Sequence, residues 1–184
     1  MGRNSVKNFL GPDRPPVLIS SKEVQERIRE LGEQISRDYE GKVPILVGVL
    51  NGAFIFMADL VRQLRIDCEV DFVKISSYGD RTESSGTVRM LKDLDADIED
   101  RDVIVVEDIV DSGLSVQWLR RYFEARKPRS LRFVTLLKKL GAAKVAYDVD
   151  YVGFEIPNAF VVGYGLDLAQ RLRNLPEIYV LDEA

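Results

Sequence analysis

A run of four β-branched residues, followed by closely spaced acids, constrains this chain more than any other stretch of its sequence. The run VIVV, Val103 to Val106, has no alternation of apolar and polar residues. This pattern predicts a strand that is buried on both faces, as in a parallel sheet. Three carboxylates follow at Glu107, Asp108 and Asp111. Because ligands of open α/β sheets bind beyond the carboxyl ends of such strands, these acids are candidate ligand contacts.

Small residues form the second half of the same stretch. Ser112, Gly113 and Ser115 precede a helical pattern that begins near Val116. Small residues at the start of a helix leave backbone N–H groups free to bind a phosphate, and the helix dipole favours the anion. A sugar phosphate would engage both the acids and this helix start.

Ordinary helix capping is the alternative interpretation. Asp or Ser at a helix N-terminus stabilises a helix by about 0.5–2 kcal/mol, which explains residues 111–115 without any ligand. Capping does not explain why Glu107 and Asp108 stand side by side at the end of a buried strand, where like charges repel. Clustered acids at such a place favour a functional site.

Length and composition exclude several classes of protein. The 184 residues fit one domain, 1–184, and the net charge of −4 argues against a general affinity for nucleic acid. The apolar runs are too short for a membrane span, and the N-terminus lacks the apolar segment of a secretory signal. Cys68 is the single cysteine, which fits a reducing cytoplasm. With no histidine in the chain, acid–base chemistry falls to Asp, Glu, Lys or Tyr.

The sequence VVEDIVDSGLS, residues 105–115, resembles the motif with which type I phosphoribosyltransferases bind phosphoribosyl diphosphate (PRPP). The likeness extends from about Ile19 to the C-terminus, and further segments narrow it to the hypoxanthine-guanine phosphoribosyltransferases. It implies an α/β fold: a mostly parallel twisted sheet flanked by helices, with a small hood. Residues from about 150 to 184 would contribute the hood, and the N-terminal strand could join it.

Apolar periodicity predicts strands alternating with helices in the first two thirds of the chain, as right-handed crossovers require. Residues 1–16 are predicted to be an irregular leader. The predicted strands are 17–19, 44–50, 69–75, 88–91, 103–106, 131–137 and 178–181. The predicted helices run from Ser20 or Ser21 to about Gly41, from 53 to 64 and from 116 to 125.

The central motif carries most of the roles that the resemblance implies. Glu107 and Asp108 would hold the ribose hydroxyls, directly or through Mg²⁺. Asp111 would face purine N7, as a general base or as the acceptor of its proton. The implied contacts of the 5′-phosphate are Asp111, Ser112, Gly113, Leu114 and Ser115, and Leu114 brings no lysine to that loop.

The sequence VLNGAFIF, residues 49–56, resembles the pyrophosphate loop of the family. Asn-Gly after a strand is usually a plain turn, but a strand–turn–helix junction can also present amides to an anion. The resemblance implies that the backbone of Leu50, Asn51 and Gly52 binds pyrophosphate, and in the family the corresponding 50–51 peptide is often cis. It also aligns Arg173 with the arginine that grips the pyrophosphate.

Residues 76–87 are polar and contain two glycines, which is typical of an exposed loop. This segment is similar to the flexible lid of the family, which closes over the reacting sugar and excludes water. Ser77 and Tyr78 match the Ser-Tyr pair of that lid.

Two further segments resemble purine-binding parts of the family. LLKK aligns Lys139 with the lysine that binds the purine 6-oxo group, and an ammonium donates to O6 but would oppose the amino group of adenine. In the segment YVGFEIPN, Tyr151 would stack on the base and the backbone of Val152 would read its edge. Asn158 stands where the family usually has an Asp that often helps to hold a second magnesium, so that metal site is predicted to be weak or missing.

The predicted activity is transfer of the phosphoribosyl group from PRPP to N9 of hypoxanthine or guanine, with Mg²⁺ as cofactor and IMP or GMP as product. The resemblance also implies a homodimer or homotetramer. Two alternatives stay open. One is an RNA-binding regulator on the same scaffold, which would use the basic residues between Arg120 and Arg132. The other is a related transferase that prefers xanthine.

Overall fold

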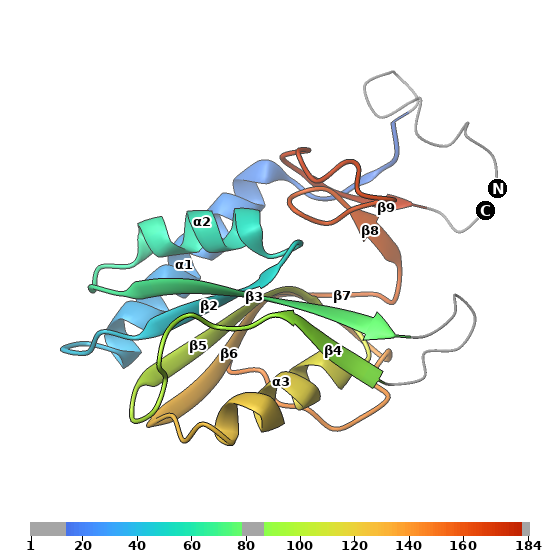
Figure 1. Cartoon of the computed structure of the whole chain (residues 1–184). Helices are drawn as coiled ribbons and strands as arrows, with labels where there is room; N and C mark the ends of the chain where they lie inside the picture. The colour runs from blue at the N-terminus through green and yellow to red at the C-terminus, as the bar shows by residue number, and fades with distance from the viewer. Residues whose placement is uncertain (1–13, 79–86, 182–184) are drawn as a thin grey trace.

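The computed structural model describes residues 14–78 and 87–181. Figure 1 shows a large sheet with helices on both faces and a smaller sheet at one end. The helices are α1 (Ser21–Asp38), α2 (Phe54–Gln63) and α3 (Leu114–Glu124). The strands are β1 (Val17–Ile19), β2 (Ile45–Leu50), β3 (Glu69–Tyr78), β4 (Thr87–Lys92), β5 (Asp102–Val110), β6 (Ser130–Lys139), β7 (Tyr151–Ile156), β8 (Phe160–Val162) and β9 (Ile178–Leu181).

The large sheet has the strand order β4-β3-β2-β5-β6-β7. Every neighbouring pair in it is parallel except β3 with β4, so the prediction of a mostly parallel sheet is confirmed. The carboxyl ends of the parallel strands therefore meet at one edge of the sheet, where α/β folds bind their ligands.

Helices α1 and α2 cover one face of this sheet and α3 covers the other (Figure 1). Side chains of β5 alternate between these faces. Ile104 and Val106 pack in the cluster with α1 and α2, whereas Val103 and Val105 pack in the cluster with α3. The run VIVV is thus buried on both faces, as its sequence predicts.

Helix α1 begins with a capping box, in which Ser20 is the N-cap. Its hydroxyl accepts a hydrogen bond from the Glu23 N–H at 3.4 Å, and the Glu23 carboxylate accepts one from the Ser20 N–H at 2.9 Å. This reciprocal pair satisfies two N–H groups that have no partner inside the helix. The helix ends at Asp38, three residues before the predicted Gly41.

The small sheet is the predicted hood, but it begins later in the chain than expected. Its order is β1-β9-β8, all antiparallel, so the N-terminal strand does join the C-terminal ones. Strand β7 instead extends the large sheet, where Tyr151 pairs with Val134 of β6. The prediction that the hood starts near residue 150 is therefore wrong for residues 151–156.

The segment predicted as a lid loop is partly strand. Ser77 pairs with Val88 and Tyr78 with Thr87, so β3 and β4 extend into both ends of the segment 76–87. Residues 79–86 of that segment, and residues 1–13 of the predicted leader, lie outside the described residues. Among the helices in the described ranges, none is long and apolar enough to cross a membrane.

Candidate functional site

A pocket of about 200 Å³ opens where the ends of β5 and β6 meet the hood. Four charged side chains line it, together with one aromatic and three aliphatic residues. Three of the charged residues were predicted as site residues, and the fourth, Asp167, was not. The lining residues are Asp108, Ile109, Asp111, Lys139, Phe160, Val161, Leu166 and Asp167. The pocket thus combines the central motif, the end of β6 and the segment that follows β7.

The end of β5 departs from simple alternation. Val105 packs toward α3 and Val106 toward α1 and α2, so alternation would place Ile109 toward α3. Ile109 packs instead with the α1 and α2 cluster, and Val110 with the α3 cluster. This change of phase brings the sequence neighbours Asp108 and Ile109 into the same pocket.

Asp108 lies directly against the loop after β2. A Cβ built on Gly52 would overlap the Asp108 carboxylate, so only glycine permits this approach. Burial raises the pKa of Asp108 to about 6, although backbone hydrogen bonds and the charge of Arg173 lower it. The negative charge of Asp167 acts in the opposite direction to the charge of Arg173 and raises the pKa of Asp108. The charges of Arg173 and Asp167 therefore both act on this carboxyl.

Glu107 is buried, with 5% of its surface exposed. Burial, together with the charge of Asp108, raises its pKa well above the usual range for a glutamate. Among the described residues, its Oε1 atom has no hydrogen-bond partner. Since an unsatisfied buried oxygen is costly, this atom favours a ligand that donates a hydrogen bond.

The start of α3 does not support the capping alternative. The N-cap is Gly113, in a left-handed conformation with φ of 80°, and it receives no side-chain cap. The Leu114 N–H donates a long hydrogen bond, of 3.5 Å, to the Ser112 hydroxyl. The start of this helix therefore keeps the capacity to bind an anion, because such a long bond is easily exchanged for one to a ligand.

Asp111 forms an ion pair across the pocket with Lys139. Lys139 Nζ lies 3.1 Å from Asp111 Oδ2, and the lysine side chain is only 12% exposed. The preceding Lys138 is directed to Glu155, at 3.1 Å. Of the two lysines, Lys139 is therefore the one whose ammonium meets an acid of the central motif.

The loop after β2 and the predicted arginine also meet near this pocket. The peptide bond between Leu50 and Asn51 is cis, as is common at this place in the family that the sequence resembles. Arg173 donates to the carbonyl of Gly165 at 2.6 Å and pairs with Asp167 at 2.7 Å. The arginine is thus held by the hood loop on which it lies.

That hood loop, residues 163–173, has an unusual backbone. Four of its non-glycine residues are in the left-handed region: Tyr164, Ala169, Gln170 and Leu172. Such conformations cost on the order of 1–3 kcal/mol each and persist where the surroundings determine them, often at functional sites. The loop positions Asp167 at the pocket.

The prediction for Tyr151 is wrong. Tyr151 is buried, its hydroxyl donates to Asp38 at 2.7 Å, and it accepts from Arg132 at 2.6 Å. It also lies at the wrong end of its strand, because Lys139 pairs with Ile156, five positions later. That separation is about 16 Å along a strand, which is too far for Tyr151 to stack on a base held by Lys139.

The predictions for Val152 and Asn158 fail with it. The carbonyl of Val152 accepts from Arg27 at 2.8 Å, so it is engaged by α1. Asn158 is exposed between β7 and β8 and does not line the pocket. The aromatic residue at the pocket is Phe160, which is 41% exposed, and the segment after β7 also contributes the carboxylate of Asp167. Both belong to the sequence FVVGYGLD, residues 160–167. The apolar run and the final acid of this sequence could have indicated Phe160 and Asp167 as site residues.

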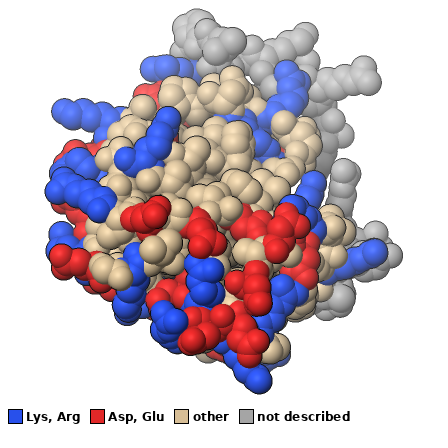
Figure 2. Space-filling view, turned by 60° about the vertical axis from the view of Figure 1, so that its left-hand side comes forward, with Lys and Arg blue, Asp and Glu red and all other residues tan. Residues whose placement is uncertain are grey.

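Three of the six basic residues between Arg120 and Arg132 pair with acids. Arg126 pairs with Asp93, and Arg132 with Asp38 at 2.9 Å. Arg129 pairs with Asp100 and Asp102. Figure 2 shows a face of the molecule on which blue and red side chains are interspersed. These pairs reduce the positive charge of the stretch and do not favour the RNA-binding alternative.

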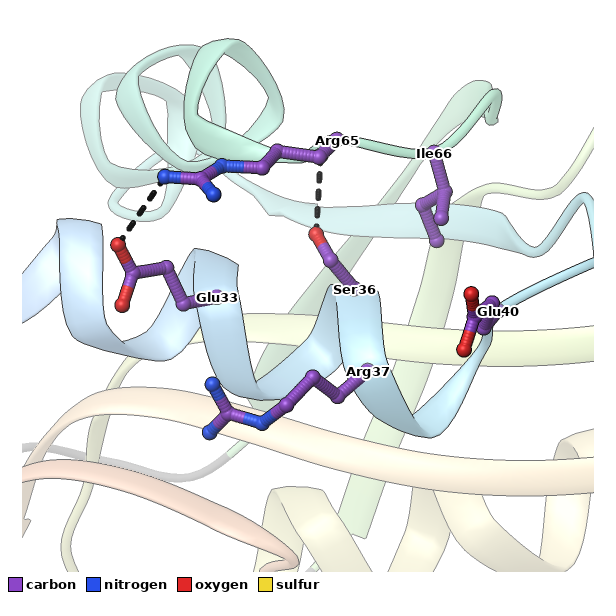
Figure 3. A pocket seen from close by; sticks show the side chains of 6 residues that line it. All are labelled: Glu33, Ser36, Arg37, Glu40, Arg65 and Ile66. Carbon is purple, nitrogen blue, oxygen red and sulfur yellow. Dashed lines mark hydrogen bonds and ion pairs between the residues drawn. The ribbon is translucent and has the colours of Figure 1, made fainter.

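Figure 3 shows a second and larger pocket, of about 370 Å³, beside the C-terminal part of α1. It is open and lies between the end of α1 and the link from α2 to β3. Two of its charged groups already pair, Arg65 with Glu33 at 3.3 Å. Its lining residues are Glu33, Ser36, Arg37, Glu40, Arg65 and Ile66. None of them is a predicted site residue, so we assign no function to it.

Comparison with known proteins agrees with the geometry. Residues 20–169 match the model of the phosphoribosyl transferase domain family. The hypoxanthine-guanine phosphoribosyltransferase of Bacillus subtilis is 49% identical over 94% of this chain and 96% of its own length. A bifunctional TilS/HprT protein of Listeria innocua is 50% identical over 98% of this chain, which spans 27% of that longer protein. The crystal structure of a hypoxanthine-guanine phosphoribosyltransferase from Bacillus anthracis has a TM-score of 0.87 and 48% identity, and the match covers 90% of this chain and 98% of the other.

Proposed function

This chain belongs to the hypoxanthine-guanine phosphoribosyltransferase family, and we propose that it transfers the 5-phosphoribosyl group of PRPP to N9 of hypoxanthine or guanine. The products are IMP or GMP and pyrophosphate. The observation that carries the proposal is the pairing of Lys139 with Asp111 beside the exposed ring of Phe160, at the carboxyl edge of the sheet.

The purine lies in this pocket with its ring on Phe160. The Lys139 ammonium donates to O6, which selects a 6-oxopurine because it would oppose the amino group of adenine. The Asp111 carboxylate accepts the proton at N7 or holds it by a hydrogen bond. Binding of the base thus exchanges the direct Lys139–Asp111 ion pair for two contacts with the ligand.

The phosphoribosyl half binds along the central motif. The N–H groups at the start of α3 and the hydroxyls of Ser112 and Ser115 bind the 5′-phosphate. Glu107 and Asp108 accept hydrogen bonds from the ribose hydroxyls, and the unpartnered Oε1 of Glu107 supports this role. As pyrophosphate leaves, positive charge develops on the ribose, and the Asp108 carboxylate stabilises it.

The leaving pyrophosphate lies between the loop after β2 and the hood. We propose that the backbone of Leu50, Asn51 and Gly52 binds it together with the guanidinium of Arg173. A guanidinium can donate two parallel hydrogen bonds to a pair of phosphate oxygens. To do so, Arg173 exchanges its contact with Asp167 for the ligand. Ser77 and Tyr78, at the end of β3, would belong to the lid that excludes water from the sugar.

Mg²⁺ fits the oxygen ligands of this site. Asp108 and Asp167 both line the pocket, and hard cations prefer carboxylate and phosphate oxygens. In the ranges that the structure describes, no group of three or more Asp, Glu, Cys or His side chains could hold a metal ion without further ligands. PRPP oxygens would complete the coordination, as is usual for magnesium. When bound, the ion neutralises charge on the leaving pyrophosphate.

The first test is nucleotide formation from PRPP and Mg²⁺ with hypoxanthine, guanine, xanthine and adenine offered separately. We expect turnover of hypoxanthine and guanine and none of adenine. Preference for xanthine would select the related transferase instead. Silence with all four bases, combined with salt-sensitive RNA binding, would favour the RNA-binding regulator and contradict the proposal. A cytoplasmic location and a homodimer or homotetramer remain predictions.

A further inference from the structure

The loop between β6 and β7, residues 140–150, packs onto the segment that we assign to the 5′-phosphate. The Lys144 N–H donates to the carbonyl of Ser112 at 3.0 Å. The ring of Tyr147 lies directly against the α-carbon of Gly113. A Cβ built on that glycine would overlap the ring. Gly113 is the N-cap of α3, so both contacts act where the helix presents its first N–H groups.

Tyr147 is anchored from behind as well. Its ring packs against the buried cluster that contains the inner face of α3. The rest of the loop is tied to α3 and β6: Arg120 donates to the carbonyl of Asp148 at 3.1 Å, and the Asp150 carboxylate accepts from the Phe133 N–H at 2.8 Å. Through Lys144 and Tyr147, this anchored loop contacts Ser112 and Gly113 of the phosphate segment.

We propose that Tyr147 is a positioning residue for the 5′-phosphate of PRPP, acting through Gly113. This inference rests on the proposed function of the site. The phosphate segment carries Leu114 where a cation could have stood, so affinity depends on how well the backbone N–H groups are aligned. Holding Gly113 in its left-handed conformation before the ligand arrives reduces the entropy that binding must remove.

The same loop joins the two halves of the site. It begins one residue after Lys139, which lines the base pocket, and reaches the phosphate segment at Lys144 and Tyr147. Loss of the Tyr147 ring should therefore weaken phosphate binding first, because Lys139 is held separately by β6 and by Asp111.

The test measures the KM for PRPP and for hypoxanthine, and the affinity for ribose 5-phosphate by calorimetry. For Tyr147→Ala we expect the KM for PRPP to rise roughly 10- to 100-fold, a parallel loss of ribose 5-phosphate affinity, and little change in the KM for hypoxanthine. Tyr147→Phe keeps the ring and should restore PRPP binding.

Tyr122→Ala is the matched control, because Tyr122 packs against the same cluster but stacks on Trp118, at 4.9 Å. It should lower thermal stability without changing the KM for PRPP. Unchanged PRPP and ribose 5-phosphate binding in Tyr147→Ala would overturn the inference, as would equal losses for both substrates. A wild-type protein that binds ribose 5-phosphate but transfers nothing would overturn the proposed function, while the calorimetric comparison still decides the role of Tyr147. Absence of binding in the wild type would overturn both.

Discussion

At the scale of single residues, the site depends on close approach as much as on charge. Asp108 reaches its place only because Gly52 has no side chain. This contact joins β5, which we assign to the ribose, to the loop that we assign to pyrophosphate. The two halves of the proposed PRPP site therefore touch each other at Gly52 and Asp108.

Gly52→Ala should therefore disturb Asp108 and its ligand. A methyl group there forces either the carboxylate or the loop to move, and a displacement near 1 Å can cost on the order of 100-fold in rate. We expect kcat/KM for PRPP to fall by roughly that factor, measured by steady-state kinetics. Gly41→Ala is the control, because Gly41 is left-handed but faces open space. It should affect stability alone, and wild-type kinetics in Gly52→Ala would contradict the prediction.

At the scale of elements, a polar contact fixes the hood to the helices. Asp59 of α2 accepts hydrogen bonds from the Tyr164 hydroxyl, which lies in the hood loop, and from Gln25 of α1 at 2.9 Å. Burial by itself raises the pKa of Asp59, but these bonds and Arg62 lower it overall. Ionised Asp59 therefore holds the loop that carries Asp167.

This contact predicts a dependence of stability on pH. Because folding lowers the pKa of Asp59, its contribution is complete above the unfolded value, near pH 4. The contribution is lost as the pH falls through the native pKa. Tyr164→Phe should cost about 1.5–3 kcal/mol at pH 7, the usual worth of a hydrogen bond to a charged group, and less at pH 3. Urea denaturation across this range measures the difference. In an Asp59→Asn background the effect of Tyr164→Phe should no longer change with pH, and a persisting change would contradict the assignment.

At the scale of the whole molecule, the two ends of the chain build the hood together. Strand β1 pairs with β9, and β9 pairs with β8, which carries Phe160. Removal of β1 thus exposes β9 and loosens the part of the hood that faces the base, while the large sheet keeps all its strands.

Deletion of residues 1–19 should therefore raise the KM for hypoxanthine more than the KM for PRPP, and it should lower the melting temperature. Steady-state kinetics with each substrate varied in turn, together with thermal melting, measure both effects. Deletion of residues 1–13 is the control, since it leaves every described contact in place. Equal effects of the two deletions would show that β1 is not responsible.

The sequence by itself determined the core of this protein. The run Val103 to Val106 identified a central strand, since only a strand covered on both faces buries four β-branched residues in succession. The acids after it, and the lysine at the end of β6, lie at the expected edge because parallel strands bring their carboxyl ends together. The order of strands and helices from β1 to β6 followed from local periodicity, which is a property of neighbouring residues, whereas β7 and β8 were not predicted as strands.

Only the tertiary structure decided which aromatic lines the pocket that we assign to the base. Tyr151 and Phe160 each begin a short apolar strand, so their local patterns are alike. They differ in the partner strand: β7 pairs with β6 in the large sheet, whereas β8 pairs with β9 in the hood. Strand pairing depends on contacts between distant parts of the chain, and no local pattern encodes it. For the same reason, the contacts of Gly52 with Asp108 and of Gly113 with Tyr147 could be seen only in the folded chain.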